Sequence, residues 1–439
     1  MARKMKDSGI EWVGEIPEGW SVSKVLHCLS MPITDGPHTT PILYDTGIPF
    51  VSAEAVSCGN GRIDFSHIRG YISEQFYKEC CQKYVPEIDD IYMIKSGATT
   101  GRVAIVDTTR VFTIWSPLAV FRCNKDCILP KFLYYYLQSP AFQKEVEFGW
   151  TFGTQQNIGM RSLEQMKVCV PQLNKQDTIA NYLDYQCTQI DLLLQKALTS
   201  IEEYKKLKQA VITQAVTKGV RGKREMKDSG NPWFGQIPTD WKLSRVGLHF
   251  SIILGKMLCN APLNDTYTLE PYYCAADVHF DGVADGERKK MWFSPIEKDL
   301  YRVSVGDLLV VEGGAGAGGS AIVENQDSYT YIQNSIMIVR SKGNTDNRYL
   351  RYLLEFLVKQ GYIDIVCNKA TIPHFTKDKL SGVPFCLCPT GEQEEIADYL
   401  DAKCAEIDGL IAKKEQLVKE LESYKKSLIY EVVTGKREV

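Results

Sequence analysis

The sequence MKDSGIEWVGEIPEGWSVSKV occupies Met5–Val25, and it returns with substitutions as MKDSGNPWFGQIPTDWKLSRV at Met226–Val246. The offset between the copies is 221 residues there and settles at 217 from about residue 90 onward. At the second offset, Ala104–Val106 matches Ala321–Val323. A register kept over most of the chain predicts a duplicated structure.

The two copies also join in the same way at their ends. The GKRE segment Gly222–Glu225 leads into the second copy, and a second GKRE segment, Gly435–Glu438, lies at the end of the sequence. The repeat therefore behaves as if it were cyclic. This predicts a pseudo-twofold molecule whose two ends lie near one another.

Composition places the chain among ordinary globular proteins. Its 439 residues include 51 Lys+Arg and 54 Asp+Glu, and 44% are hydrophobic, so two or three domains are expected. The 14 cysteines form no CxxC pair and the first residues hold no apolar signal core, which predicts a reducing cytoplasm. No apolar run approaches the roughly 18 residues of a membrane span, so no membrane contact is expected.

Each copy ends in a segment without proline, at 172–218 and 390–434, whose apolar residues recur at steps of three and four. This periodicity is typical of a coiled-coil helix. About 45 residues make a helix of roughly 65 Å, and the other copy is the simplest partner for its stripe. The alternative is two unrelated helices, each packed on its own domain. The predicted interface comprises Ile179, Leu183, Ile190, Leu194, Ile201, Tyr204, Val211, Ile396, Leu400, Ile407, Ile411, Val418, Leu421 and Leu428.

The remainder of each copy is rich in turns and predicts a mixed α/β domain, most divergent at about 26–87 against 247–304. The whole is therefore predicted as an α+β fold: two pseudo-twofold-related domains separated by an antiparallel coiled coil. Its segments are a first domain at 1–171, a helix and linker at 172–225, a second domain at 226–389 and a second helix at 390–439. Strands are predicted at Ile91–Ile94, Val103–Val106, Leu308–Val311 and Tyr331–Val339, and one buried helix per copy at Pro130–Phe148 and Asn347–Val358.

Motifs of catalysis are missing from the sequence. Gly314, Gly316 and Gly319 match G-x-G-x-x-G, but a strand-like run follows them where a dinucleotide site needs a helix N-terminus. A turn between strands is predicted instead. The sequence has no GKS or GKT phosphate loop, no GxSxG elbow and no HExxH helix, and its six histidines lack metal-ligand spacing. We therefore predict no metal site and no catalytic residue.

Three further marks accompany the duplicated domains and long helices. These are GEIPEGW at Gly14–Trp20, a D-x6-G-x3-G element that begins at Asp90, and a Pro/Gln signature before each helix. Together they resemble the specificity subunit of type I restriction-modification enzymes, over essentially the whole chain. Members of that family tend to read PPLxEQ before the helix. Here Pro171–Gln176 reads PQLNKQ and Cys388–Gln393 reads CPTGEQ, so each copy keeps one proline and the glutamine.

The resemblance implies a DNA reader without catalytic activity. Two target recognition domains would each read one half of an asymmetric, bipartite site in double-stranded DNA. The paired helices would act as a ruler and as a platform for two methyltransferase subunits, which two restriction/translocase subunits then join. No cofactor is implied on this chain, and S-adenosylmethionine, ATP and Mg are expected on the partners. Independently, two similar modules on a stiff antiparallel rod would meet a duplex in opposite orientations, one turn of which is about 34 Å.

Candidate DNA contacts are of three kinds. Glycine-rich turns offer backbone N–H groups to phosphate, although a tight structural turn explains them equally well. A row of amide side chains suits adenine edges, or else it connects to the following helix. Charged residues in the divergent spans suit phosphate or guanine, or else form a solvated cluster. The candidates are Arg62, His67, Arg69, Gly97, Thr99, Thr100, Arg102, Thr154, Gln155, Gln156, Asn157, Arg288, Lys289, Lys290, Gly314, Gly316, Lys369, Thr371 and His374.

Two other classes of function stay open from the sequence. One is a fused restriction-modification enzyme with its own activity, against which the missing motifs argue. The other is a coiled-coil adaptor whose mixed domains bind protein partners.

Overall fold

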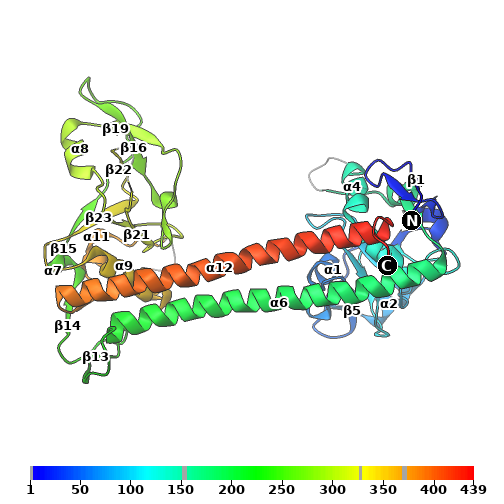
Figure 1. Cartoon of the computed structure of the whole chain (residues 1–439), viewed down its shortest axis with the longest axis horizontal. Coiled ribbons are helices and arrows are strands. Elements are labelled where there is room, and N and C mark those ends of the chain that lie inside the picture. Colours follow the sequence, from blue (N-terminus) through cyan, green and yellow to red (C-terminus); the bar gives the residue numbers. More distant parts are fainter. Residues whose placement is uncertain (1–2, 151–155, 326–328, 368–372) are drawn as a thin grey trace. The chain divides into compact units, whose positions relative to one another are not determined.

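The computed structural model describes residues 3–150, 156–325, 329–367 and 373–439. By its contacts the chain divides into a first unit, residues 1–198 and 415–439, and a second unit, residues 199–414. Each unit combines one mixed domain with half of each of two long helices, α6 (Leu173–Lys218) and α12 (Thr390–Val433) (Figure 1). None of the described helices is long and apolar enough to cross a membrane.

The first unit is organised around a four-stranded antiparallel sheet with the order β4-β10-β7-β8, beside a three-stranded sheet with the order β6-β5-β9. All residues of β7 and β10 are buried, because they lie between two apolar cores. The elements are β1 (Met5–Asp7), β2 (Glu15–Pro17), β3 (Ser21–Lys24), η1 (Val25–Cys28), β4 (Thr34–Asp35), β5 (Ile48–Val51), α1 (Ala53–Cys58), η2 (Phe65–His67), β6 (Tyr71–Ile72), α2 (Glu74–Cys81), β7 (Ile91–Ile94), β8 (Val103–Ile105), β9 (Thr113–Ile114), β10 (Leu118–Phe121), α3 (Pro130–Gln138), α4 (Pro140–Phe148), α5 (Met160–Gln165) and β11 (Lys167–Val170).

The second unit repeats this arrangement around the sheet β15-β23-β20-β21, beside the sheet β19-β16-β22. Its elements are β12 (Met226–Asp228), β13 (Gln236–Pro238), β14 (Lys242–Arg245), α7 (Val246–His249), β15 (Phe250–Leu254), β16 (Thr268–Tyr273), η3 (Ala275–Asp277), β17 (Val278–His279), β18 (Gly282–Val283), β19 (Lys290–Phe293), α8 (Pro295–Tyr301), β20 (Leu308–Val311), β21 (Ser320–Ile322), β22 (Tyr331–Ile332), β23 (Ile336–Ser341), α9 (Asn347–Lys359), α10 (Tyr362–Val366), α11 (Lys377–Ser381) and β24 (Pro384–Leu387). The predicted mixed α/β class is confirmed in both copies.

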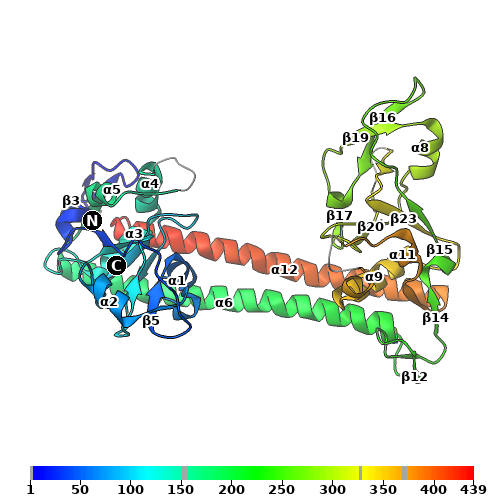
Figure 2. The same cartoon turned by 180° about the vertical axis from the view of Figure 1, so that it is seen from behind.

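The two long helices pack against each other in antiparallel directions within each unit (Figure 2). In the first unit, the start of α6 shares one apolar core with the end of α12, and Lys425 donates to Asp191 at 2.6 Å. In the second unit, the end of α6 shares a core with the start of α12, and Lys208 donates to Asp408 at 2.6 Å. The alternative of two unrelated helices is therefore wrong. The residues of the predicted stripe are buried or half-buried.

Both helices stop at a glycine in the left-handed region, Gly219 (φ 74°) and Gly435 (φ 71°). A Cβ at these positions would lie 3.2 Å from the ring of Trp241 and 3.0 Å from the ring of Trp20, respectively. Glycine is required there because other residues strain this backbone and would crowd the tryptophan. The structural counterpart of Gly435 is thus Gly219, and not the Gly222 that the GKRE match suggested.

The two ends of the chain meet in the first unit. The Tyr430 hydroxyl of α12 donates to the carbonyl of Val13 at 3.3 Å, and Lys436 donates to the carbonyl of Glu15 at 3.4 Å. In the second unit, the hairpin β12–β13 contributes Ile237 to the apolar core that also contains Ala215 and Val216 near the end of α6. The predicted proximity of the two ends is therefore confirmed.

The glutamine of the Pro/Gln signature ties each long helix to the domain that precedes it. The fully buried Gln176 side chain accepts from the Leu129 N–H at 2.7 Å and donates to the Pro171 carbonyl at 2.8 Å. Its counterpart Gln393 accepts from the Asp346 N–H at 3.1 Å and donates to the Cys388 carbonyl at 2.8 Å. In the first unit these bonds hold the start of α3 against the start of α6, and in the second unit they hold the start of α9 against the start of α12.

We expect Gln176→Leu to lower the free energy of unfolding by about 1–3 kcal/mol, because the Leu129 N–H and the Pro171 carbonyl would lose their buried partner. Chemical denaturation of the wild-type chain and the variant measures this difference. Gln172→Leu is the matched control, since the Gln172 side chain is exposed. Equal losses in the two variants would contradict this role for Gln176.

Two sequence-based boundaries are corrected by the structure. The single helix predicted at Pro130–Phe148 is two helices, α3 and α4, because Pro140 has no N–H to continue the helix and Ser139 adopts an extended backbone (ψ 143°). The single strand predicted at Tyr331–Val339 is β22 followed by β23. The Ile336 N–H donates to the Gln333 carbonyl at 2.9 Å in the turn that separates them.

Candidate nucleic-acid interface

Several chain segments leave the main sheet of the first unit at one end, where β4 and β7 finish and β10 begins. The Lys95 N–H donates to the Pro117 carbonyl at 2.8 Å, and the Ile158 N–H donates to the Lys95 carbonyl at 2.8 Å. These bonds gather segments that are far apart in sequence. We call this surface the loop end of the first unit; it comprises residues 36–47, 95–102, 115–117 and 156–158.

The second unit has a matching surface at the same end of its main sheet. The Asn334 N–H donates to the Lys256 carbonyl at 2.8 Å, and the Phe375 N–H donates to the Glu312 carbonyl at 2.6 Å. The loop end of the second unit comprises residues 255–267, 312–319, 333–335 and 373–375. Two equivalent loop ends follow from the duplication, because the strands that carry them are equivalent.

A glycine-rich turn lies in each loop end, between β7 and β8 and between β20 and β21. Gly97 and Gly101 have φ values of 102° and 92°, and Gly314 and Gly318 have φ values of 88° and 83°. The strand pairs flanking each turn are antiparallel, so the prediction of a turn between strands, rather than a dinucleotide site, is confirmed.

Most backbone N–H groups of the first turn already have partners. The N–H groups of Gly97, Thr100, Gly101 and Arg102 all donate to carbonyl groups of the same unit. The Thr100 hydroxyl donates to the Gly97 carbonyl at 2.7 Å. A phosphate at this turn would therefore meet side chains such as the exposed Arg102 rather than these amides.

The predicted polar rows lie directly against the glycine turns. The Gly97 N–H donates to the Gln156 carbonyl at 3.0 Å, and Asn157 forms a backbone bridge with Ser96. In the second unit, exposed His374 forms the same bridge with Gly313. The structure thus brings Gly97, Thr99, Thr100 and Arg102 together with Gln156 and Asn157, and Gly314 and Gly316 together with His374. The candidates Thr154, Gln155, Lys369 and Thr371 lie outside the described residues.

The charged candidates of the first unit do not form one patch. Arg62 forms an ion pair with Asp107 and lines a cleft that also includes Asp191 of α6. The exposed His67 lies 2.7 Å from Asp64. Arg69 lies against Trp115 of the loop end.

Arg69 stacks on an aromatic ring of the loop end. Its guanidinium lies 4.5 Å from the ring centre of Trp115 and donates to Glu54 at 3.0 Å. Burial alone would raise the pKa of Glu54, but hydrogen bonds from Ser52 and Arg69 hold it below its usual range. The pair leaves Arg69 only partly available to DNA.

The charged candidates of the second unit lie at the start of β19. Arg288 is turned inward, with its guanidinium 4.8 Å from the ring centre of Tyr273 and 3.5 Å from Asp277. Lys289 and Lys290 are exposed. These two lysines, and not Arg288, present free charge at the surface.

The aspartate of the D-x6-G-x3-G element pairs with an arginine in or directly after the neighbouring strand of the main sheet. Asp90 accepts two hydrogen bonds from Arg122, each 2.8 Å long, and Asp307 accepts two from Arg340, each 2.7 Å long. Both aspartates are almost completely buried. This bidentate pair fixes the strands from which each glycine turn projects.

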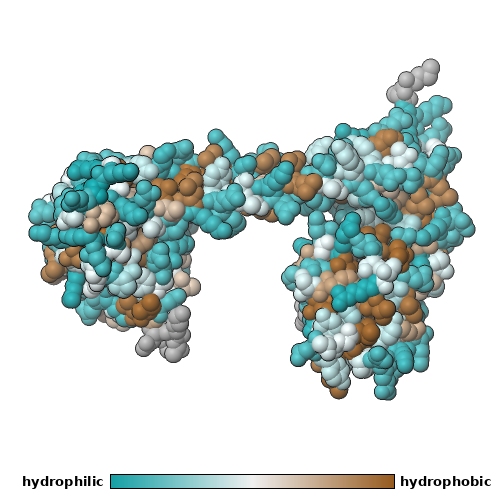
Figure 3. Space-filling view, turned by 90° about the horizontal axis from the view of Figure 1, so that it is seen from below, coloured by the Kyte–Doolittle hydropathy of each residue, from teal (hydrophilic) through white to brown (hydrophobic). Residues whose placement is uncertain are grey.

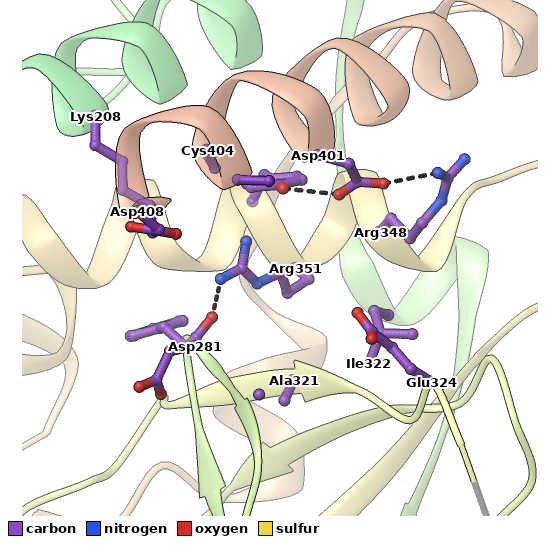
Figure 4. Close-up of a pocket in the computed structure, with 14 residues that line it drawn as sticks. Lys208, Asp281, Ala321, Ile322, Glu324, Arg348, Arg351, Asp401, Cys404 and Asp408 are labelled. Carbon is purple, nitrogen blue, oxygen red and sulfur yellow. Dashed lines mark hydrogen bonds and ion pairs between the residues drawn. The ribbon is translucent and has the colours of Figure 1, made fainter. Parts of the chain in front are cut away.

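A cleft of about 420 Å³ separates the mixed domain of the second unit from its long helices (Figure 4). Across it, Asp401 of α12 accepts from the Tyr352 hydroxyl at 2.7 Å and from Arg348 at 2.8 Å. In the first unit, Asp184 of α6 likewise accepts from the Tyr135 hydroxyl at 2.7 Å and from Lys131. Burial and the neighbouring carboxylates raise the pKa of both tyrosines, so they remain donors. These bonds orient each loop end on its helices.

Across the described residues, no group of three or more His, Cys, Asp or Glu side chains is arranged to hold a metal ion.

The family model described as "Type I restriction modification DNA specificity domain" matches residues 39–203 and 239–420, which is most of the chain. The chain belongs to this family.

Individual relatives agree with the family assignment. The specificity subunit of the type I restriction enzyme StySPI from Salmonella potsdam is 21% identical, over 96% of this chain and 90% of that protein. A chain from a solved type I R-M system superimposes with a TM-score of 0.71 at 16% identity, covering 95% of this chain and 98% of that chain. The HsdS subunit from Thermoanaerobacter tengcongensis gives 0.53 at 17% identity, covering 96% and 98%. These two structures show the shared fold.

The protein is therefore a type I specificity subunit, a DNA-recognition component without catalytic activity.

Sequence reasoning missed the parts of its loop ends that lie in the divergent spans. In the first unit, buried Asp35 is paired with Lys83 and lies 3.2 Å from Lys95. Burial would raise the pKa of Asp35, but these lysines hold it below its usual range. No repeat match marks Asp35, since its neighbourhood differs between the copies.

Proposed function

We propose that this specificity subunit reads an asymmetric, bipartite site in double-stranded DNA, one half with each loop end. The observation that carries the proposal is that both units present equivalent segments at the same end of equivalent sheets, while the side chains on those segments differ. Because the two loop ends are equivalent in structure, they suit two domains that bind one duplex in opposite orientations. Because their side chains differ, they suit two different half-sites.

We further propose that the paired helices set the length of the unread spacer. The contacts of Asp184 and Asp401 hold each mixed domain on its helices, so a change in helix length would move a loop end along the DNA. At about 1.5 Å per residue, one added helical turn shifts a loop end by roughly 5 Å. That is more than the rise of one base pair, about 3.4 Å.

The helices are also the proposed platform for two methyltransferase subunits. On α6, Leu192, Leu193 and Leu198 are 47%, 51% and 53% exposed in the first unit, and Leu207 is 49% exposed in the second. Apolar surface is visible along the helices (Figure 3). Repeated exposed leucines on a helix are typical of a surface that another protein covers. Two restriction/translocase subunits would then join. S-adenosylmethionine, ATP and Mg would be bound by those partners, and the complex would act in the cytoplasm.

Reconstitution with cognate methyltransferase subunits tests this function. We expect the complex to retard a duplex that carries the target, and to methylate adenine in it, while the isolated chain transfers no methyl group. Mapping methylated adenines across the host genome supplies the target. Methyl transfer by the chain alone would favour a fused enzyme. A complex that forms but does not discriminate between duplexes would favour a protein-binding adaptor.

A further inference from the structure

Each loop end carries a long loop that exposes apolar side chains to solvent. In the first unit, Ile42 and Leu43 are 75% and 41% exposed. In the second unit, Met257, Leu258 and Leu263 are 75%, 52% and 78% exposed. Exposing apolar side chains to water is unfavourable. Their repeated exposure at the same place therefore indicates a surface that is covered in the working complex.

Both loops begin at the same structural position. A Cβ on Gly36 would lie 2.0 Å from the Ile114 carbonyl oxygen, and a Cβ on Gly255 would lie 2.4 Å from the Gln333 carbonyl oxygen. Each loop must therefore leave the main sheet at a glycine pressed against the backbone at the end of β9 or β22, in the three-stranded sheet of the same unit. Beyond that glycine the first loop reads PHTTPILY and the second reads KMLCNAPL. The fold fixes where the loops start, and the sequence leaves their side chains free to differ.

Contacts on both sides hold the first loop in place. Near its start, His38 lies 3.1 Å from buried Asp35. At its far side, the Tyr44 N–H donates to the Tyr71 carbonyl at 2.8 Å, and the Tyr71 N–H donates to the Tyr44 carbonyl at 3.0 Å. Ile42 and Leu43 lie between these anchors. A loop held at both sides presents its side chains at little further entropic cost.

The second loop is anchored in a comparable way. Lys256 is buried and forms an ion pair with Glu297 at the start of α8. Further along the loop, the Trp292 N–H of β19 donates to the Cys259 carbonyl at 3.0 Å. Met257 and Leu258 lie between these anchors, and Leu263 follows them. The apolar side chains in both units therefore project from ordered backbone beside the glycine turn.

We propose that these two loops contact the base pairs of the two half-sites directly, through their apolar side chains. Apolar side chains in a groove of DNA contact thymine methyl groups or wedge between base steps. Ile42 and Leu43 would contact bases of the half-site read by the first unit. Met257 and Leu263 would contact bases of the half-site read by the second unit. This inference rests on the proposed DNA-reading function, and it names the side chains that discriminate.

The test uses the chain assembled with its methyltransferase subunits and two duplexes: the mapped target, and a duplex in which the first half-site is scrambled. We expect Ile42→Ser with Leu43→Ser to weaken binding to the target by about tenfold or more, the scale of losing base contacts. Binding to the scrambled duplex and the salt dependence of binding should not change, because both report phosphate contacts. Met257→Ser with Leu263→Ser should show the same pattern when the second half-site is scrambled.

Val111→Ser and Val305→Ser are the matched controls. These valines are 53% and 61% exposed, and they precede β9 and β20 at the end of the sheets opposite the loop ends. The inference is overturned if the loop variants bind the target like the controls, or lose affinity equally for both duplexes. Loss of methyltransferase subunits on gel filtration would also overturn it, since the loops would then dock protein. If the wild-type complex fails to discriminate the duplexes, the proposed function fails instead.

Discussion

Replacing residues 26–170 with the corresponding segment of another type I specificity subunit should change one half of the DNA target and leave the other half as it was. The structural reason is that this segment enters and leaves the first unit at neighbouring points. β3 pairs with β11 in antiparallel register, and the Val25 N–H donates to the Met166 carbonyl at 2.8 Å. A segment whose ends are adjacent can be exchanged without moving the long helices. Mapping methylated adenines in a host that carries the exchanged subunit measures the result.

The reciprocal exchange is the control. Residues 247–387 also begin and end side by side, because β14 pairs with β24 and the Val246 N–H donates to the Val383 carbonyl at 3.0 Å. This exchange should alter only the opposite half of the target. If either exchange changed both halves, the two domains would not read DNA independently and the modular interpretation would be wrong.

The second large effect is expected from the buried aspartates of the D-x6-G-x3-G element. Asp90→Asn should lower the free energy of unfolding by about 3–5 kcal/mol, because the half-buried Arg122 guanidinium loses the carboxylate that holds it. Asp90 is only 1% exposed, and it also accepts from the Glu87 N–H at 2.8 Å. Asp307→Asn should have a similar effect in the second unit through Arg340. Denaturant unfolding followed by circular dichroism measures both.

Asp126→Asn is the control for that experiment, since Asp126 is exposed. Combining Asp90→Asn with Arg122→Gln should recover part of the loss, because no unpaired charge then remains in the sheet. A loss below about 1 kcal/mol for both Asp90→Asn and Asp307→Asn would place these aspartates among ordinary surface residues. The ion pair would then not be what fixes the strands beside the glycine turns.

The duplication and the two long helices could be predicted from sequence because both depend on patterns that extend over many residues. The apolar stripe of α6 and α12 repeats for about a dozen turns, and local errors do not disturb a signal of that length. The helix and the strand that a short turn interrupts were harder to predict. Pro140 divides α3 from α4, and Gln333–Ser335 divides β22 from β23, because in each case a break of only a few residues lies between two apolar segments.

The candidate DNA contacts were predicted less completely, for a physical reason. Charge alone does not reveal whether a side chain already has a partner: Arg62 pairs with Asp107, and Arg288 lies over Tyr273. The glycine turns could be found because glycines recur at the same offset in the second copy, and Gln156 could be found because it stands in a row of amide side chains. The loops that follow Gly36 and Gly255 could not, because the two copies share no sequence there and only the three-dimensional structure shows that they begin at the same place.

The ion pairs between the long helices have a consequence for how such genes diversify. Asp191 lies in the first copy and its partner Lys425 in the second, whereas Asp408 lies in the second copy and its partner Lys208 in the first. A mutation of one of these residues therefore removes an ion pair with the other repeat. We expect the paired residues of the two helices to change together. Exchange of a segment that lies within one domain leaves both pairs intact. Exchange of a segment that includes only one of the two helices separates Asp191 from Lys425 and Lys208 from Asp408.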